Sequence, residues 1–193
     1  SDGKVNRAHT SIDLGVGVRV VVGDQVGYAY TEELELGSMI RAAATASAIA
    51  RTGHGAAPIE IKLGQVENFY PVNRYWRDVD LSERVPLVRV WEERAFAAEK
   101  RVIKVQCSLS DTDRHVLIAR ADGTLAADYR PMTRAFVSCT AEEGDVRESG
   151  AYNVASRADL SYYDADRQAR LVNLSVQRAV RALDAETPQA GEM

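Results

Sequence analysis

Glycine-containing turn signals, each placed between runs of strand-forming residues, constrain the fold of this chain more than any other feature. The first, Gly23-Asp24, separates the alternating run Val16–Val22 from the β-branched and aromatic run Val26–Tyr30. Similar signals follow at Asp122-Gly123 and Glu143-Gly144-Asp145. Such dipeptides between two extended runs are typical of tight antiparallel hairpins. The chain is therefore expected to build its sheet from hairpins.

Alternating and β-rich runs predict where the other strands lie. The expected meander comprises Val102–Leu109, Arg114–Ala121, Leu125–Tyr129, Thr133–Ala141 and Val146–Asn153. Pro131 is expected to interrupt this series, because a proline cannot donate a hydrogen bond to a ladder. A further short strand is expected at Ile59–Leu63.

A first amphipathic helix is predicted from Glu33 or Leu36 to Arg51. Its expected N-cap is Thr31 and its expected end is at Gly53. The residues expected on its apolar face are Leu36, Ile40, Ala43 and Ala44. The middle of this segment is rich in alanine, and side chains that small allow a helix to lie close to a sheet.

Two more helices are predicted later in the chain. One runs from Asp80 or Ser82 to about Lys100, and its expected buried stripe is Val88, Trp91, Ala95 and Ala98. Pro86 fits the first turn of this helix if Ser82 or Glu83 is the N-cap, but would kink the helix if Asp80 is. The last helix is expected to be capped by Asp164 and to reach Leu183, with an apolar face of Val172, Val176, Ala179, Val180 and Leu183.

Hairpins grouped apart from helices predict an α+β fold, with an antiparallel or mixed sheet packed by about three amphipathic helices. We expect one domain over residues 1–193, with possible sub-units at 1–64 and 65–193. Gly15–Arg51 and Thr133–Ala185 share one plan, a hairpin followed by an amphipathic helix. This plan is either an internal duplication or a common small unit that occurs twice.

Composition excludes several classes of protein. The formal net charge is -4, from 24 basic and 28 acidic residues, whereas a nucleic-acid-binding domain normally carries a basic excess. No run of apolar residues is long enough for a membrane span, which needs about 18. With only two cysteines, Cys107 and Cys139, a reducing cytoplasm is the expected location.

Residues that could carry chemistry do not form a recognisable catalytic or metal-binding motif. None of His9, His54 and His115 has a histidine or cysteine at metal-ligand spacing. Cys107 and Cys139 lie among apolar strand residues, where a buried, inert thiol is the usual state. We therefore assign no catalytic residue and no metal ligand to this chain.

Arginines near the meander give one sharper hypothesis. Arg130, Arg134 and Arg157 could anchor carboxylate groups of a substrate through bidentate hydrogen bonds. The alternative is an exposed strand face on which Asp128 and Glu148 balance these charges.

The chain resembles the TldD/PmbA family over nearly its whole length, most closely the TldD branch. The segments that carry the resemblance occur in order: Gly15–Val20, Gly27–Thr31, Leu109-Ser110, Asp122–Asp128 with Arg130-Pro131 and Arg134, Ala141–Gly144, Ala179–Leu183 and Pro188–Gly191. Ordered agreement at so many places is more specific than any single motif.

This resemblance implies that the chain is the N-terminal domain of a TldD-like zinc metallopeptidase, cut at both ends. Such enzymes act in the cytoplasm on unfolded or short peptides, together with a TldE/PmbA-type partner subunit or as a self-dimer. The family's zinc site, an H-E-x-x-x-H helix completed by a later cysteine, matches no position here. Zinc is therefore expected in the missing C-terminal domain, and this segment alone is expected to be inactive.

The role implied for the segment is to form a substrate groove and to contact the partner, with an extended peptide added at a sheet edge. The alternative is a self-contained, non-catalytic peptide-binding or assembly domain.

Overall fold

The structure is a computed structural model that describes residues 6–50, 60, 62–64, 67–186 and 191. The chain divides into two compact units. One unit comprises residues 6–60, and the other comprises residues 61–193 together with 1–5. Each unit is described by itself below.

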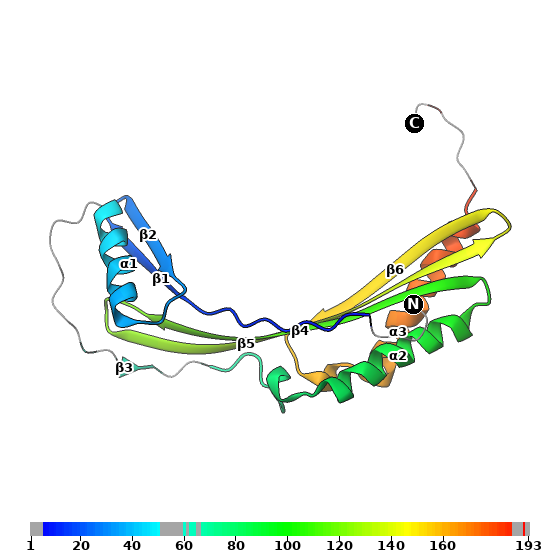
Figure 1. Cartoon of the computed structure of the whole chain (residues 1–193), viewed down its shortest axis with the longest axis horizontal. Helices are drawn as coiled ribbons and strands as arrows, with labels where there is room; N and C mark the ends of the chain where they lie inside the picture. The colour runs from blue at the N-terminus through cyan, green and yellow to red at the C-terminus, as the bar shows by residue number, and fades with distance from the viewer. Residues whose placement is uncertain (1–5, 51–59, 61, 65–66, 187–190, 192–193) are drawn as a thin grey trace. The chain divides into compact units, whose positions relative to one another are not determined.

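The unit of residues 6–60 is a β-hairpin with one helix packed on it (Figure 1). Strands β1 (Val16–Val22) and β2 (Gln25–Thr31) pair antiparallel. Their last pair, Val22 with Gln25, encloses Gly23-Asp24, which confirms the predicted turn. Helix α1 covers Leu36–Ile49. The helix ends at Ile49 with Ala50 as its C-cap, earlier than the predicted end at Arg51, and Gly53 itself lies outside the described residues.

The buried face of α1 differs from the prediction. Ser38, Ala42 and Ala46 are buried, whereas Leu36 and Ile40 are 70% and 58% exposed. The close approach of the hairpin explains this choice, because a Cβ on Gly27 would lie 1.8 Å from the Ala46 carbonyl oxygen. Only the small-residue face of the helix fits at that spacing.

The N-cap prediction for α1 is also wrong. Glu35 occupies the N-cap position. The Thr31 hydroxyl instead accepts a hydrogen bond from the Glu33 N–H (3.1 Å), so Thr31 stabilises a local turn before the helix begins.

The unit of residues 61–193 is built on a mixed sheet. Long strands β4 (Val102–Ala119) and β5 (Thr124–Glu143) form an antiparallel hairpin, and β6 (Val146–Ser156) pairs with the other side of β5. The short strand β3 (Lys62–Leu63) runs parallel to the start of β5. Together with three helices, this arrangement confirms the α+β class.

The predicted breaks within the meander are wrong. Val102–Leu109 and Arg114–Ala121 belong to one strand that ends at Ala119, and Leu125–Tyr129 and Thr133–Ala141 belong to another. Pro131 lies inside β5 because its backbone nitrogen points away from β4. On that side the pairing with β6 stops at Thr133, so no strand among the described residues needs the missing N–H of Pro131.

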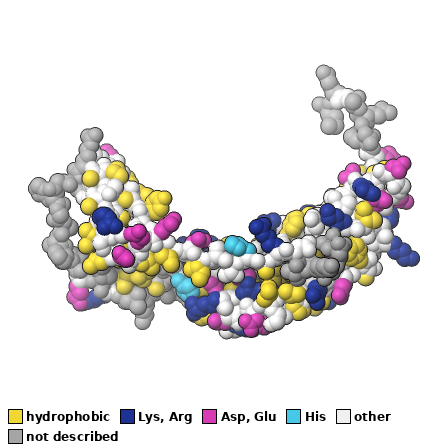
Figure 2. All heavy atoms as spheres, in the orientation of Figure 1, with side chains coloured by type: hydrophobic (Ala, Val, Ile, Leu, Met, Phe, Trp, Pro, Cys, Tyr) yellow, Lys and Arg dark blue, Asp and Glu magenta, His cyan; other side chains and the backbone are white. Residues whose placement is uncertain are grey.

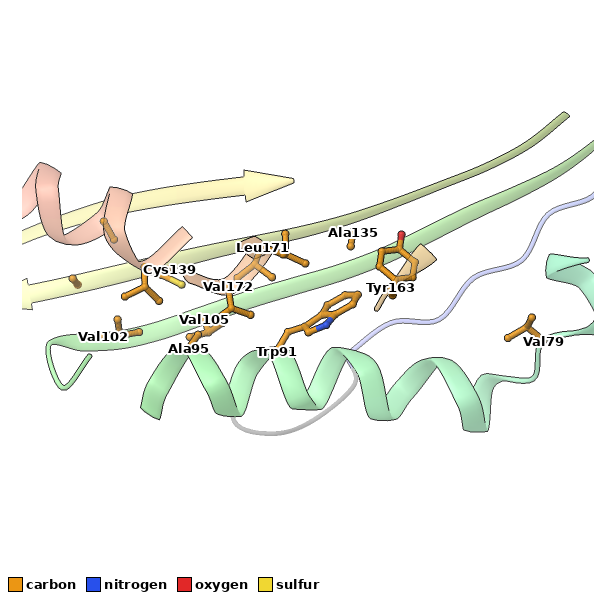
Figure 3. Packing of buried hydrophobic residues seen from close by; sticks show 14 of the residues in the cluster. Val79, Trp91, Ala95, Val102, Val105, Ala135, Cys139, Tyr163, Leu171 and Val172 are labelled. Atoms are coloured by element: carbon orange, nitrogen blue, oxygen red, sulfur yellow. The ribbon is translucent and has the colours of Figure 1, made fainter. Parts of the chain in front are cut away.

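Two helices cover one face of this sheet. Helix α2 (Leu81–Ala98) packs on β4, and α3 (Ala165–Leu183) packs on β5 and β6. Short 3₁₀ turns, Trp76–Asp78 and Leu160–Tyr162, precede them. Figure 3 shows how residues from both helices and the strands meet in one core, among them Trp91, Val105, Cys139 and Leu171.

The caps and faces of these helices largely match the prediction. Asp164 caps α3 by accepting from the Arg167 N–H (2.8 Å), and Val172, Val176 and Ala179 are buried. Asp80 is the N-cap of α2, and the backbone N–H of Asp80 donates a hydrogen bond to the Glu83 carboxylate (3.3 Å).

The position of Pro86 and the exposure of Ala98 complete the description of α2. Pro86 lies within α2, which continues to Ala98. The predicted stripe is correct at Trp91 and Ala95, but Ala98 is exposed, because α2 ends there and the chain turns away into β4.

Both segments of the proposed duplication form a hairpin with a helix packed on it. The choice between a duplication and a recurrent unit stays open. Among the described residues, no helix combines the length and hydropathy that a membrane crossing requires.

Candidate functional site

The sheet face opposite α2 and α3, within the unit of residues 61–193, is mainly polar and is interrupted by apolar side chains such as Ile118 and Met132. Side chains alternate along a strand, and the odd-numbered residues of β5 from Pro131 to Ala141 are buried under the helices. The even-numbered residues therefore point to the opposite face. In β4 the corresponding residues are exposed from Lys104 to Arg114, and they include Gln106, Ser108, Ser110 and Thr112. Figure 2 shows Lys and Arg side chains along the surface over β4–β6.

The outer edge of β4 offers unpaired backbone groups. The Arg120 N–H donates to the Thr124 carbonyl (2.8 Å), so Arg120 points its backbone groups at β5. Since the register runs without a shift from Lys104 to Ala119, even-numbered residues bond to β5 and odd-numbered residues point outward. No strand pairs with this outer edge in the part of the chain that the structure describes.

The outer edge of β6 is different because side chains from nearby elements cap it. Arg178 Nη1 of α3 donates to the Ala151 carbonyl (2.8 Å), and the Tyr162 hydroxyl donates to the Ala155 carbonyl (3.2 Å). Side chains that occupy edge carbonyls compete with an added strand. Of the two edges, β4 is therefore better suited to pair with a further strand.

The structure brings two of the three predicted arginines onto one surface. Arg130 and Arg134 are both even-numbered residues of β5 and lie on the open face. The Arg134 guanidinium lies 5.7 Å from the centroid of the Phe136 ring. Arg157 follows the end of β6, and its guanidinium stacks over the Tyr70 ring at 4.8 Å. Binding of substrate by these arginines stays a prediction.

The acidic residues predicted to balance these arginines contribute unequally. Asp128 Oδ2 lies 2.5 Å from Arg130 Nε. Within the described part of the chain, Glu148 forms no ion pair with any of the three arginines. It lies opposite Ala141 near the other end of β5. Part of the open-face charge therefore remains unbalanced.

Sequence reasoning missed Arg114 on this face. Arg114 lies directly opposite Arg130 in the β4–β5 ladder. The signal was present in the Asp122-Gly123 turn, because extending its register along unbroken strands places 114 opposite 130. The expected breaks at Pro131 and before Arg114 hid this pairing.

The thiols are unsuited to nucleophilic or metal chemistry. Cys107 lies on β4 and Cys139 on β5, and Cys139 is fully buried. Burial raises the pKa of the Cys107 thiol to about 12 and that of the Cys139 thiol to about 11. The predicted burial holds for Cys139, whereas Cys107 is only partly buried. With raised pKa values both thiols are expected to be neutral near pH 7, and their inertness stays a prediction.

The described histidines do not form a metal site. The His115 ring packs against the rings of Tyr129 and Tyr75, with centroid separations of 5.0 and 6.0 Å. His9 is exposed, and His54 lies outside the described residues. Among the described residues, no three His, Cys, Asp or Glu side chains gather in a way that could hold a metal ion.

Asp113 beside His115 has a structural role. Its carboxylate accepts from the backbone N–H groups of Trp76 (3.3 Å) and Arg77 (2.6 Å) and from the Tyr129 hydroxyl. These bonds attach the loop before α2 to the sheet. A hollow of about 460 Å³ lies next to them, between Glu67 and Asn68 and the strand residues near His115 and Tyr129.

Comparison with known proteins places the chain in a family. Residues 74–183 match the model of the PmbA/TldA metallopeptidase central domain, and residues 1–50 match that of PmbA/TldA metallopeptidase domain 1. The chain belongs to the TldD/PmbA family of metallopeptidases. This confirms the resemblance inferred from the sequence.

Curated relatives of this family are named as metalloproteases. The chain is 34% identical, over all of its length, to the metalloprotease TldD homolog of Haemophilus influenzae and covers 41% of that protein. It is 28% identical, over 88% of its length, to the TldD homolog of Buchnera aphidicola and covers 36% of it. The chain therefore spans about two-fifths of the length of these relatives.

Solved structures share the fold. The putative modulator of a DNA gyrase from Thermotoga maritima matches 98% of this chain with a TM-score of 0.73 and 16% identity, over 42% of its own length. TldE from Thermococcus kodakarensis matches 92% with a TM-score of 0.60 and 17% identity, over 40% of its length. At these identities the likeness concerns the fold alone.

Proposed function

We propose that this chain is the substrate-groove and partner-contact domain of a TldD-like zinc metallopeptidase that acts on unfolded or short peptides. The observation that carries the proposal is the unpaired outer edge of β4, whose odd-numbered residues from Val105 to Ala119 point backbone donors and acceptors outward. An extended peptide can add a strand there.

Such binding would tolerate many sequences. Main-chain hydrogen bonds supply affinity without reading side chains. Only an extended, unfolded segment can present its backbone to a sheet edge. The preference of the enzyme for unfolded or short peptides would follow from this geometry.

The zinc belongs, in this proposal, to a part of the protein beyond this chain. The described residues offer no suitable donor set, and burial keeps the thiols of Cys107 and Cys139 protonated by raising the pKa of each. The described residues therefore do not fit the metal, and their proposed role is confined to holding the peptide.

A proline at the β4 edge tests peptide binding. Leu117→Pro removes an outward N–H of β4, and Asn153→Pro removes one from the outer edge of β6. In the full-length protein, Leu117→Pro is expected to weaken binding of an extended peptide about fivefold, the loss of about one hydrogen bond. Asn153→Pro should leave binding unchanged. Equal binding by both variants and the unmodified protein would contradict the proposal.

The alternative is a self-contained, non-catalytic peptide-binding or assembly domain. The encoding reading frame after Met193 distinguishes the two. An H-E-x-x-x-H helix in the continuation supports the peptidase, whereas an early stop codon supports the alternative. Purified by itself, the chain should neither retain stoichiometric zinc nor cleave peptides.

The partner in this proposal is a TldE/PmbA-type subunit or a second copy of the same protein, in the cytoplasm. Light scattering of the full-length protein, alone and mixed with a TldE/PmbA-type subunit, measures which assembly forms. A protein that stays monomeric in both samples would contradict the partner-contact role.

A further inference from the structure

The cross-strand pair of Arg114 and Arg130 places two like charges opposite each other on the open face of the sheet. Like charges in directly opposite positions destabilise a β-sheet. Arg134 adds a third positive charge further along β5 on the same face. Repulsion between these charges lowers the stability of the sheet. Proteins retain such unfavourable local arrangements mainly at functional sites.

The carboxylates of the sheet neutralise only part of this charge. Asp128 pairs with Arg130 (Nε to Oδ2, 2.5 Å). The other acidic side chain on this face of β5, Glu142, pairs with Arg147 of β6 at the far end of the strand. Even-numbered β4 residues from Lys104 to Ile118 include no acid. Among the described residues, no ion pair or hydrogen bond of the Arg114 guanidinium is found, and its side chain is exposed.

Arg114 also lies on the strand to which a peptide would add. Since the backbone groups of Arg114 point to β5, a residue opposite Arg114 on an antiparallel added strand would form a non-hydrogen-bonded pair. Side chains approach each other most closely in such pairs. A guanidinium this close to the side chain of the added strand can bind its carboxylate with two parallel hydrogen bonds.

We infer that Arg114, supported by Arg130, forms a subsite for an acidic side chain of the bound peptide. This inference rests on the proposed addition of a peptide strand to β4. The peptide residue concerned is an aspartate or glutamate opposite Arg114 on the open face. The subsite sets the register of the peptide and gives the enzyme a preference for substrates with an acidic residue at that place.

The test uses the full-length protein and two short unstructured peptides of Ala, Ser and Thr that differ only by one central Glu or Gln. The unmodified protein is expected to bind the Glu peptide about fivefold more tightly than the Gln peptide, as for an exposed ion pair. Arg114→Gln should abolish this difference. Arg147→Gln is the matched control, because it removes the same charge from the same sheet face where Glu142 already pairs with it, and it should retain the preference.

Charge reversal extends the test. Arg114→Glu should reverse the preference, so that a peptide with a central Lys binds more tightly than the Glu peptide. Raising the salt concentration should reduce the preference in both directions. A variant that binds the Lys and Glu peptides equally at low salt would overturn the inference.

The remaining outcomes separate this inference from the proposed function. Equal binding of the Glu and Gln peptides by the unmodified protein, with weaker binding by Leu117→Pro, overturns the acidic subsite and leaves strand addition in place. Unchanged binding by Leu117→Pro overturns strand addition. A loss of preference in Arg147→Gln as large as in Arg114→Gln would mean that overall charge acts rather than this subsite, and would overturn the inference.

Discussion

Gly150 of β6 lies against the backbone of Ala179 in α3, so closely that a Cβ on Gly150 would stand 2.1 Å from the Ala179 nitrogen. The atoms in the way belong to the helix backbone and cannot swing aside as a flexible side chain could. Gly27 has the same relationship to Ala46 of α1 in the other unit. In both units, therefore, a glycine of the hairpin lets the helix approach.

Gly150→Ala is expected to destabilise the fold by about 3 kcal/mol, because α3 must move away from the sheet. Gly144→Ala is the comparison. Gly144 has a positive φ of 60° with nothing near its Cβ position, so this change should cost about 1 kcal/mol of backbone strain. Urea unfolding followed by circular dichroism measures both free energies. Equal losses would mean that the helix does not lie as close as the structure places it.

Asp113→Ala is expected to lower the free energy of unfolding by about 3 kcal/mol, because two backbone N–H groups and the Tyr129 hydroxyl lose their acceptor together. Tyr129→Phe removes one of these bonds and should cost about 1 kcal/mol. Chemical denaturation of the two variants gives the comparison. An Asp113→Ala variant no less stable than Tyr129→Phe would show that the carboxylate does not hold the loop.

The two thiols are expected to resist modification in the folded protein. Burial raises the pKa of Cys139 to about 11 and that of Cys107 to about 12, from an ordinary value of 9.0. At pH 8 a thiol reagent should therefore react slowly with the native protein and quickly in urea. Rapid reaction of Cys139 under native conditions would contradict its burial.

These thiols also predict how stability depends on pH. A raised pKa in the folded state means that the stabilising contribution is complete below pH 9 and is lost as the pH rises through 11 and 12. The unfolding free energy should fall over that window. A variant with Cys107→Ala and Cys139→Ala should show a smaller fall than the unmodified protein, and an identical fall in both would contradict the prediction.

Local signals were sufficient for several elements. The Gly23-Asp24 and Asp122-Gly123 turns depend on residues that are adjacent in the chain. The cap of α3 at Asp164 depends on contacts within one helical turn. These features need no distant partner, and all of them have the positions that the sequence predicted.

Long-range packing decided what local signals could not. Pro131 ends a strand in most local contexts, yet it is accommodated because β6 stops pairing at Thr133. Leu36 and Ile40 are among the most apolar residues of α1, yet the helix buries Ala42 and Ala46 because Gly27 lies so close.

The same distinction holds for the candidate site. The sequence by itself determined that Arg130 and Arg134 lie near a strand, that no metal-ligand motif is present, and that the chain resembles TldD-like proteins. Only the tertiary structure decided that Arg114 faces Arg130 and that the edge of β4 is unpaired. The reason is that strand register and edge exposure depend on which distant segments pair, whereas turns, caps and side-chain periodicity depend on neighbours in the chain.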